Sequence, residues 1–395
     1  MPRDGNLSGH PSRALDLLNF FIADVQTGFG AFVAVYLTLH KWTQIEIGTV
    51  LSAGTVFALI AQIPAGALVD AVTNKRLIVG IGLSGVFIAA VLLALRPNEL
   101  PVYVAEVLHA GASSVITPAI AAISLHLVGR EGLGERLGRN ARYASIGSGL
   151  SAAVMGASGG ILSSRAVFWL TAALCLPALA TLTAIGRGIH ARQQTTVRPL
   201  DWPGLRQLFA DRRLLVFAGA VMFFHLANAG MMPLAGAAVT MRTGAFANLI
   251  IAVCIMVPQA VVAITSPRLG RAATTLGRRP VLLFGWAALP VQGVLLAVLP
   301  GAWSIIAVQL VAGISAAVFG IMLPLVSADL TRGTSHFNLC MGLLGLGVTV
   351  GAALSTLLSG WVAQEVSMTA AFLGLAAVGL AGVLLLWTAM PETAN

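Results

Sequence analysis

A few side chains that can hold or transfer a proton interrupt the long apolar segments of this sequence. Asp24 lies about ten residues into the first segment, a depth of about 15 Å if the segment is helical. Glu106 and His109 are three residues apart and would share a helix face, where a carboxylate beside an imidazole is suited to relay protons. Because a charge at membrane depth costs about 2.5–3.5 kcal/mol, each of these residues calls for an explanation.

Other polar residues extend this set. His225 and Asn228 are also three residues apart, near the middle of the seventh apolar segment, and with Asp24 they predict a polar cluster at the midplane. Simpler interpretations stay open, because Asp24 could support the run DVQTGFG by a structural hydrogen bond, and Glu106 could reach external water. The predicted set for proton coupling or solute binding is Asp24, Glu106, His109, His225, Asn228, Gln309 and Gln26.

Composition indicates that lipid surrounds the chain. Of its 395 residues 57% are hydrophobic and 9% are charged, whereas a soluble domain carries about 25% charged residues. The net charge of +9 does not indicate nucleic-acid binding, because the cations lie in the short gaps between apolar segments. Cys175, Cys254 and Cys340 lie within apolar segments and are expected to be packing residues, not a disulfide framework.

No sequence motif indicates an enzyme or a bound cofactor. H-E-x-x-H, C-x-x-C, the P-loop and G-x-S-x-G are absent from the sequence, and so is any Cys/His cluster with metal-site spacing. The polar first dozen residues lack the apolar core of a cleavable signal peptide. We therefore expect no enzymatic activity, no cofactor and no metal, and we expect any energy input to come from a gradient.

The apolar segments are long enough to cross a bilayer as helices, which takes about 20 residues each. Strands of a membrane barrel would alternate in polarity, and these segments do not. The sequence therefore predicts an all-α membrane protein with twelve spanning helices, at roughly 14–39, 46–69, 77–95, 101–127, 142–162, 166–186, 213–239, 247–267, 280–299, 302–328, 338–362 and 368–390.

The distribution of cations predicts the orientation. With the N-terminus in the cytoplasm, only Lys41, Arg96, Arg165 and Arg242 fall outside, and the other 19 of the 23 Lys and Arg residues (23 − 4) fall inside. We therefore expect both termini in the cytoplasm. The predicted organisation is a tail at 1–13, a six-helix bundle at 14–187, a linker at 188–212, a second six-helix bundle at 213–390 and a tail at 391–395.

The basic linker contains a short segment that could form an amphipathic helix. Asp201 followed by Pro203 is a helix-start signal, and Trp202, Leu205 and Phe209 would then share one face. We expect this helix to lie on the inner membrane surface, and an ordinary linker is the alternative.

The two halves of the sequence repeat. At an interval of 204 residues, Gly66 falls on Gly270 and Lys75 on Arg279, so a glycine-started, cation-ended turn recurs once in each half. Further matches pair Phe20, Ala23 and Asp24 with Phe224, Ala227 and Asn228 at 204, Glu106 and Val115 with Gln309 and Val318 at 203, and Asn140 and Gly147 with Asn338 and Gly345 at 198. Six helices per repeat give two parallel halves, with a central cavity expected between them near the midplane.

At this turn the sequence resembles the major facilitator superfamily. The family signature after helix two reads approximately G-x-L-x-D-R-x-G-R-[KR], and Gly66, Leu68, Asp70 and Lys75 match it, whereas Ala71 and Thr73 depart from it. Within the family the chain looks most like a poorly characterised bacterial branch, on the stretches LNFFIADVQTGFGAFVAVYL at 18–37, GERLGRNARY at 134–143, FFHLANAGMMPL at 223–234 and SADLTRGTSHFNL at 327–339. The resemblance implies a transporter that works by alternating access, with no cargo indicated.

The resemblance also implies a cytoplasmic gate. Asp70 would pair with a nearby cation and with the start of helix eleven, although Lys75 and Arg76 could merely fix the topology. The second copy has Thr274 in place of the Asp, so Asp329 and Arg332, three residues apart, could form a local substitute. The predicted gate comprises Gly66, Asp70, Lys75, Arg76, Arg139, Arg142, Gly270, Gly277, Arg278, Arg279, Asp329 and Arg332.

Helix five resembles the glycine signature of the family's antiporters only in part. Gly147, Gly156 and Gly160 match the pattern G-x8-G-x3-G-P-x2-G, whereas Ile161 and Ser164 replace its Pro and last Gly. Close packing of helices on small residues is the alternative.

These features predict a monomeric secondary transporter of a bacterial inner membrane that exports a small organic solute in exchange for protons. Proton-driven uptake, for example of a metabolite or a siderophore, is the alternative within the same class. A sensor that binds without transport would be expected to carry a long extension, and an intramembrane enzyme would need a catalytic pair, for which only Glu106 and His109 are close.

Overall fold

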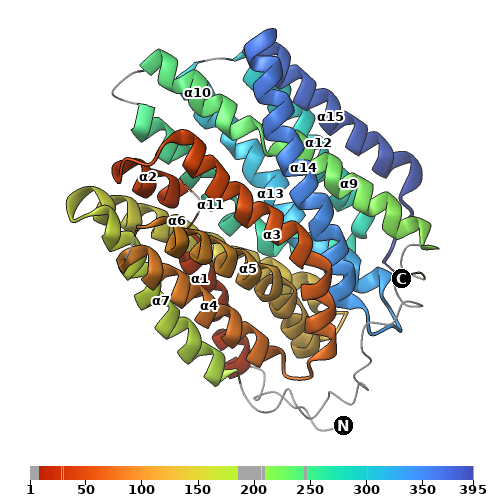
Figure 1. Cartoon of the computed structure of the whole chain (residues 1–395). Coiled ribbons are helices and arrows are strands. Elements are labelled where there is room, and N and C mark those ends of the chain that lie inside the picture. Colours follow the sequence, from red (N-terminus) through yellow and green to blue (C-terminus); the bar gives the residue numbers. More distant parts are fainter. Residues whose placement is uncertain are drawn as a thin grey trace. The chain divides into compact units, whose positions relative to one another are not determined.

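The computed structural model describes residues 9–27, 29, 31–95, 97–185, 206, 210–243, 247–299 and 301–394. All regular structure in this part of the chain is helical (Figure 1). The helices are α1 (Gly9–Thr27), α2 (Ala31–Leu39), α3 (Gln44–Ala71), α4 (Lys75–Leu95), α5 (Glu99–Val128), α6 (Leu133–Ile161), α7 (Ser164–Ala184), α9 (Arg212–Asn228), α10 (Met231–Thr243), α11 (Ala247–Thr275), α12 (Arg278–Val298), α13 (Ala302–Leu330), α14 (Phe337–Glu365) and α15 (Met368–Ala389).

The predicted all-helical membrane fold is confirmed. Among the described residues, eleven spans are long and apolar enough to cross a membrane. The remaining long helix, α6, begins with the charged residues Glu135, Arg136 and Arg139. The predicted amphipathic helix of the linker falls almost entirely outside the described residues.

Two of the twelve predicted helices are interrupted. The segment 14–39 forms α1 and α2, which are separated after Thr27, and the segment 213–239 forms α9 and α10, which are separated after Asn228. Glycine disfavours helix, and Gly28, Gly30 and Gly230 follow these ends in the sequence. In the second break the backbone N–H of Gly230 donates to Ser355 Oγ at 2.8 Å, a tertiary contact made by the broken backbone.

Other helices extend beyond their predicted ends. The predicted loop residues 133–141 form the first turns of α6, and residues 268–275 form the last turns of α11. Gly270 is therefore helical, as is Gly66, which the predicted span 46–69 already included. The connections in the structure are only 72–74 and 276–277. Hydropathy locates only the part of a helix within lipid, whereas these helices continue past it and pack on neighbours.

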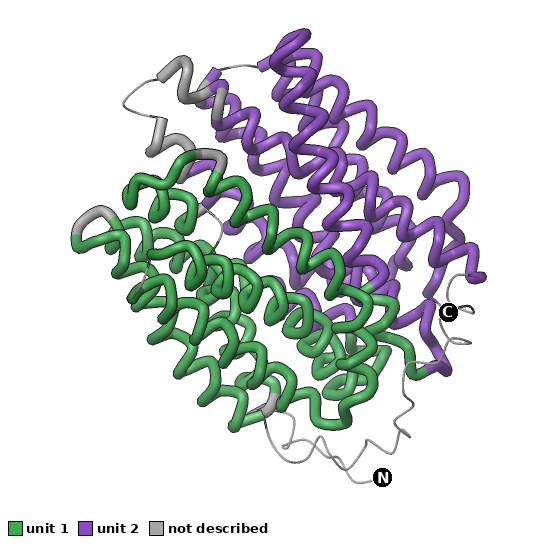
Figure 2. The backbone as a smooth tube through the Cα atoms, viewed as in Figure 1, with its two compact units in different colours: residues 1–133, 142–199, 335–342 green, residues 134–141, 200–334, 343–395 purple. Residues whose placement is uncertain are grey.

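The helices divide into two compact units (Figure 2). Unit 1 comprises residues 1–133, 142–199 and 335–342, and unit 2 comprises residues 134–141, 200–334 and 343–395. In unit 1, α1 packs on α7, α3 on α5, and α4 on both α5 and α7. In unit 2 the same pairings recur, with α9 on α15, α11 on α13, and α12 on both α13 and α15. The repetition seen in the sequence is thus a repetition of packing.

Buried aromatic residues join helices within each unit. Tyr36 is 1% exposed, and its hydroxyl donates to the carbonyl oxygen of Leu93 at 2.6 Å, which ties α2 to α4. In unit 2 the indole N–H of Trp286, which is fully buried, donates to the carbonyl oxygen of Ala220 at 3.0 Å and ties α12 to α9. Both polar atoms are therefore satisfied inside an apolar core.

Candidate functional site

The end of α3 crosses the start of α14 at a distance that only glycine permits. A Cβ atom built on Gly66 would lie closer than 3.0 Å to the carbonyl oxygen of Asn338, and one built on Gly342 would lie closer than 3.0 Å to that of Gln62. Real Cβ atoms essentially never come this close to another atom. All four residues belong to unit 1, so this first crossing forms part of its packing.

The end of α11 crosses the start of α6 in the same way. A Cβ atom on Gly270 would meet the carbonyl oxygen of Gly134, and one on Gly138 would meet that of Ser266, again closer than 3.0 Å. All four residues belong to unit 2. Each of them matches a residue of the first crossing at an interval of 204, because 62, 66, 134 and 138 correspond to 266, 270, 338 and 342. This interval replaces the predicted 198, which rested on the matches of Asn140 with Asn338 and of Gly147 with Gly345.

Asp70 binds the first turn of α14. Its carboxylate accepts hydrogen bonds from the backbone N–H of Asn338 at 3.1 Å, from the Asn338 side-chain amide at 2.7 Å and from the backbone N–H of Leu339 at 2.8 Å. The first N–H groups of a helix lack partners within it, and the helix dipole favours a negative charge there. The contact therefore combines three hydrogen bonds with a favourable electrostatic interaction.

Two of the cations predicted to pair with Asp70 instead donate hydrogen bonds to main-chain carbonyl oxygens. The Lys75 ammonium donates to main-chain carbonyl oxygens at the end of α3, those of Val69, Asp70 (3.3 Å) and Val72 (2.7 Å). The Arg76 guanidinium donates to the carbonyl oxygen of Ile185, just after α7. Of the other two candidates, Arg139 lies in the part of α6 that belongs to unit 2 and Arg142 in the part that belongs to unit 1.

The second copy of the turn has a different network. Thr274 occupies the position of Asp70, and its hydroxyl donates a hydrogen bond to the main-chain carbonyl oxygen of Arg271 in the same helix. Asp329, expected to act with Arg332, instead pairs with Arg278 at 2.8 Å, and both side chains are less than 10% exposed. The local spacing was misleading, because Arg278 also donates to the carbonyl oxygen of Ala273 at 2.6 Å and so is held in place from α11.

Glu392 completes this network. Its carboxylate accepts hydrogen bonds from the backbone N–H of Arg278 at 2.8 Å and of Arg279 at 3.0 Å, just after Gly277, whose φ is 98°. Partial burial raises the pKa of Glu392, but hydrogen bonds from the backbone N–H groups of Ala394, Arg278, Arg279 and Thr393 outweigh this and hold the pKa below its usual value. The carboxylate therefore caps α12 in the charged form.

Asp24 is buried beside a third close crossing, between α1 and α6. A Cβ atom on Gly147 would lie closer than 3.0 Å to the carbonyl oxygen of Phe20. One turn further along both helices, Asp24 is 3% exposed, and Ser151 Oγ donates to the main-chain carbonyl oxygen of Asp24 at 3.2 Å. Asp24 thus lies three residues before α1 ends, with a hydroxyl group close by.

Unit 2 contains the equivalent crossing. Gly351 and Ser355 follow Gly147 and Ser151 by 204 residues. A Cβ atom on Gly351 would lie about 2.5 Å from the carbonyl oxygen of Met222, and Ser355 accepts the hydrogen bond from Gly230. Matching Gly and Ser residues of α6 and α14 therefore contact α1 before its break, and α9 and the break that follows it.

Glu106 and His109 share α5 but have separate surroundings. Glu106 is 6% exposed and lies against Gly54 of α3, and its Oε1 has no hydrogen-bond partner among the described residues. The His109 ring stacks on Phe29 with centroids 4.0 Å apart, and its Nε2 lies 3.4 Å from Ser113 Oγ. The described contacts do not join the two residues, so a relay between them stays a prediction.

The remaining predicted polar residues lie in different parts of the two units. His225 contacts Phe319 edge to face with centroids 4.6 Å apart, and its Nδ1 lies 3.4 Å from the carbonyl oxygen of Val221. Asn228 is the last residue of α9. Gln309 is 3% exposed, and Gln26 Nε2 has no partner among the described residues. Because Asp24 belongs to unit 1 and His225 to unit 2, their clustering stays a prediction.

In the predicted antiporter signature, Gly147 lies at a close crossing and Gly156 does not. A Cβ atom on Gly156 would meet no described atom within 4 Å, and the packing of Gly160 lies outside the description. Packing therefore explains the first glycine and not the second.

Comparison with known proteins identifies the family. The model of the Major Facilitator Superfamily matches residues 15–258 and 230–395. The chain belongs to this superfamily. It is 38% identical to an uncharacterised transporter of the same superfamily found in two strains of Mycobacterium tuberculosis, over 97% of this chain and 94% of the relative. The superfamily transporter described here therefore has relatives without an assigned cargo.

Solved structures of the superfamily share its fold. The Escherichia coli fucose:proton symporter FucP aligns with a TM-score of 0.73 at 14% identity, over 97% of this chain and 99% of the other. The nucleoside transporter NupG aligns with a TM-score of 0.65 at 15% identity, over 95% and 98%. The human organic anion transporter TETRAN aligns with a TM-score of 0.69 at 14% identity, over 95% and 99%. At these identities the likeness concerns the fold alone.

Several contact residues were absent from the sequence prediction. They are Gln62, Gly134, Gly138, Ser151, Ser266, Gly342, Gly351, Ser355 and Glu392. All except Glu392 could have been found by extending the interval of 204 along the whole chain. Glu392 acts through a contact between distant segments, which the repeat does not reveal.

Proposed function

We propose that this superfamily transporter exports a small organic solute in exchange for protons, by alternating access. The observation that carries the proposal is the burial of Asp24, which is 3% exposed on α1 three residues before that helix ends. Interrupted helices mark solute and ion sites in secondary transporters, and ionisable residues at membrane depth mark proton pathways.

The surroundings of Asp24 favour proton exchange over a fixed ion pair. The neighbouring group on α6 is the hydroxyl of Ser151, which donates to the main-chain carbonyl oxygen of Asp24. A hydroxyl group can also hydrogen-bond to a carboxylic acid or to a carboxylate. A charged partner would instead hold the residue in one state. Glu106 is the second candidate, because its Oε1 has no partner in the part of the chain that the structure describes, which leaves a proton as the simplest compensation for its burial.

Export is the preferred direction because helix α6 retains part of the antiporter glycine pattern, and Gly156 is free of the packing contact that would otherwise account for it. Proton-driven uptake of a metabolite or a siderophore is the second candidate, and FucP, whose name states that it is a fucose:proton symporter, has this fold. An apolar pathway with few acids favours a neutral or amphipathic solute. The proposed location is a bacterial inner membrane, with both termini cytoplasmic and the chain monomeric.

The contact between Asp70 and the start of α14 is proposed as the cytoplasmic latch. The carboxylate spans two segments 268 residues apart in sequence. Its loss would release the start of α14 from α3 and favour the inward-open state, since a conformational equilibrium follows the differential free energy of its contacts.

Proton movement in proteoliposomes tests the coupling proposal. The wild type, Asp24→Asn, Glu106→Gln and the exposed control Glu365→Gln are reconstituted with a pH dye, and pooled solutes are screened against an imposed pH gradient. A solute that moves protons through the wild type and the control but not through Asp24→Asn supports Asp24 as the coupling residue. Coupling that survives in Asp24→Asn and is lost in Glu106→Gln moves the site to α5, and coupling retained in both overturns the assignment.

A further inference from the structure

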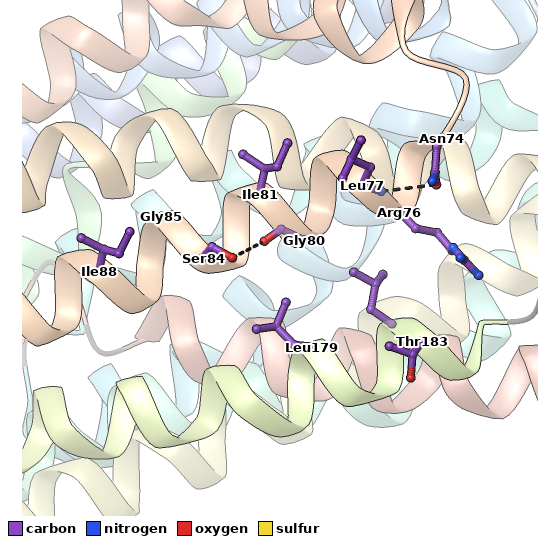
Figure 3. Close-up of a pocket in the computed structure, with 11 residues that line it drawn as sticks. Asn74, Arg76, Leu77, Gly80, Ile81, Ser84, Gly85, Ile88, Leu179 and Thr183 are labelled. Carbon is purple, nitrogen blue, oxygen red and sulfur yellow. Dashed lines mark hydrogen bonds between the residues drawn. The ribbon is translucent and has the colours of Figure 1, made fainter.

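A cavity of about 640 Å³ lies between α4 and α7 in unit 1 (Figure 3). It is polar at one end, where Asn74 and Arg76 at the start of α4 lie near Thr183 of α7. Both helices are candidate membrane spans, so the cavity opens on a surface that lipid covers. None of its polar residues takes part in the proposed proton pathway.

The rest of the cavity is an apolar groove along α4 and α7. Ile81 and Ile88 of α4 are 63% and 49% exposed and lie about two turns apart, and with Leu179 of α7 they line the groove (Figure 3). Ser84 lies between them, but its hydroxyl donates to Gly80 in its own helix at 2.9 Å, which leaves an apolar surface. The groove therefore runs from a polar end into a lining that suits a hydrocarbon chain.

The polar end carries positive charge. Arg76 can donate five hydrogen bonds. Among the described residues its guanidinium donates to the carbonyl oxygen of Ile185, while its buried Nε has no partner. The first turn of α4, which begins at Lys75, adds the positive end of a helix dipole. The nearby Lys75 ammonium already donates its hydrogen bonds to main-chain carbonyl oxygens at the end of α3. The charge available to a ligand is thus that of Arg76 and of the helix start.

Unit 2 repeats the arrangement independently. Arg279, at the start of α12, donates to the carbonyl oxygen of Trp387 near the end of α15 at 2.5 Å. A cavity of about 390 Å³ beside it is lined by Arg212, Arg213 and Thr388. In both units an arginine at a helix start and a threonine near a helix end therefore lie at the mouth of a surface cavity.

We propose that the groove between α4 and α7 binds an anionic phospholipid, with its phosphate at Arg76 and one acyl chain along Ile81 and Ile88. Charge complementarity selects the headgroup, because basic pockets between membrane helices attract anionic lipids. The exposed isoleucines and Leu179 provide the apolar surface for the chain. The site is separate from solute transport and does not depend on which solute is carried.

Photocrosslinking in mixed vesicles tests this site. The full-length protein is reconstituted with phosphatidylglycerol or phosphatidylcholine that carries the same photoreactive acyl chain, and the labelled peptides of α4 and α7 are quantified. We expect phosphatidylglycerol to label these peptides about fivefold more than phosphatidylcholine, the difference that one favourable charge makes near a membrane surface. Equal labelling by the two lipids in the wild type would overturn the proposal.

Variants separate the headgroup contact from the groove. Arg76→Gln is expected to abolish the preference for phosphatidylglycerol, whereas Arg76→Lys and the exposed, same-charge control Arg268→Gln keep it. Ser84→Phe fills the groove and should reduce labelling by both lipids. Thermal unfolding of each variant in detergent checks that it folds.

A preference for phosphatidylglycerol that is unchanged in Arg76→Gln contradicts the headgroup site. Competition by soluble glycerol phosphate would show that the site recognises phosphate without a chain.

Discussion

The carboxylate of Asp70 accepts a hydrogen bond of 2.8 Å from the backbone N–H of Leu339, at the first turn of α14. The equivalent position in the second copy, Thr274, makes no such bond in the described structure and donates to its own helix. There Arg271 and Glu135 form an ion pair across the crossing, 3.8 Å apart and more than half exposed. Two crossings with the same glycine packing therefore differ in their polar contacts.

We predict that Asp70→Asn loosens the first crossing. A hydrogen bond to a charged group contributes about 1.5–3 kcal/mol, and each 1.4 kcal/mol is about a tenfold change in an equilibrium. Cys340, one residue beyond Leu339 and fully buried, is a native reporter. Its labelling by a membrane-permeant maleimide should become about tenfold faster in Asp70→Asn. Cys340→Ser identifies the labelled thiol, and Glu135→Gln, which alters only an exposed pair, should label like the wild type.

We predict that Gly66→Ala and Gly270→Ala both destabilise the protein. Each new methyl group would meet a carbonyl oxygen closer than 3.0 Å, and overpacking costs about 1–3 kcal/mol. Gly156→Ala is the matched control, because its methyl group would meet no described atom within 4 Å and alanine favours helix. Thermal unfolding in detergent should rank Gly156→Ala at or above the wild type. A similar loss in all three variants would show that the crossings are not special.

We predict that Asp329→Asn destabilises unit 2 more than Arg332→Gln does. The ion pair with Arg278 is buried, and removal of one partner of such a pair costs about 3–5 kcal/mol. Arg332 lies in the exposed turn after α13, where a substitution usually changes stability by less than about 0.5 kcal/mol. Thermal unfolding measures both. The double variant Arg278→Met, Asp329→Leu should recover part of the loss, and a fully additive loss would argue against a coupled pair.

We predict an acid-dependent contribution from Glu392. Its pKa is lower in the folded protein than in the unfolded chain, so its stabilisation is fully present above the unfolded value and is lost as the pH falls through the folded value. The wild type should therefore unfold at a higher temperature than Glu392→Gln at neutral pH, and the difference should shrink at pH values below about 4.3, the usual pKa of Glu. A difference that stays constant on acidification would contradict the charged cap.

The sequence predicted the helices better than their ends and contacts. Apolar runs of sufficient length revealed the spans, because lipid imposes the same demand on every segment. The apolar runs did not reveal the first turns of α6. These turns contain the charged residues Glu135 and Arg136, and they pack on α11. The break between α1 and α2 was also missed, because hydropathy does not respond to a loss of helical hydrogen bonds.

The residues of the candidate site were predictable only where a short motif or the internal repeat identifies them. Asp70 was found through its turn, but its acceptor role toward Leu339 came from the family resemblance. Asp329 was assigned to Arg332 by spacing, whereas its partner Arg278 lies 51 residues away. Such pairings depend on which helices pack together, and a single sequence does not show this.

The repeated crossings also show where the chain has been free to change length. The five pairs of corresponding uninterrupted helices differ by one residue at most: α3 and α11 have 28 and 29 residues, α4 and α12 have 21 each, α5 and α13 have 30 and 29, α6 and α14 have 29 each, and α7 and α15 have 21 and 22. One connection differs by two residues, since 129–132 has four residues and the corresponding 331–336 has six. One residue inserted in a helix turns all that follows by about 100°, which would carry a glycine away from its carbonyl oxygen. The loops are therefore where engineered insertions should be tolerated.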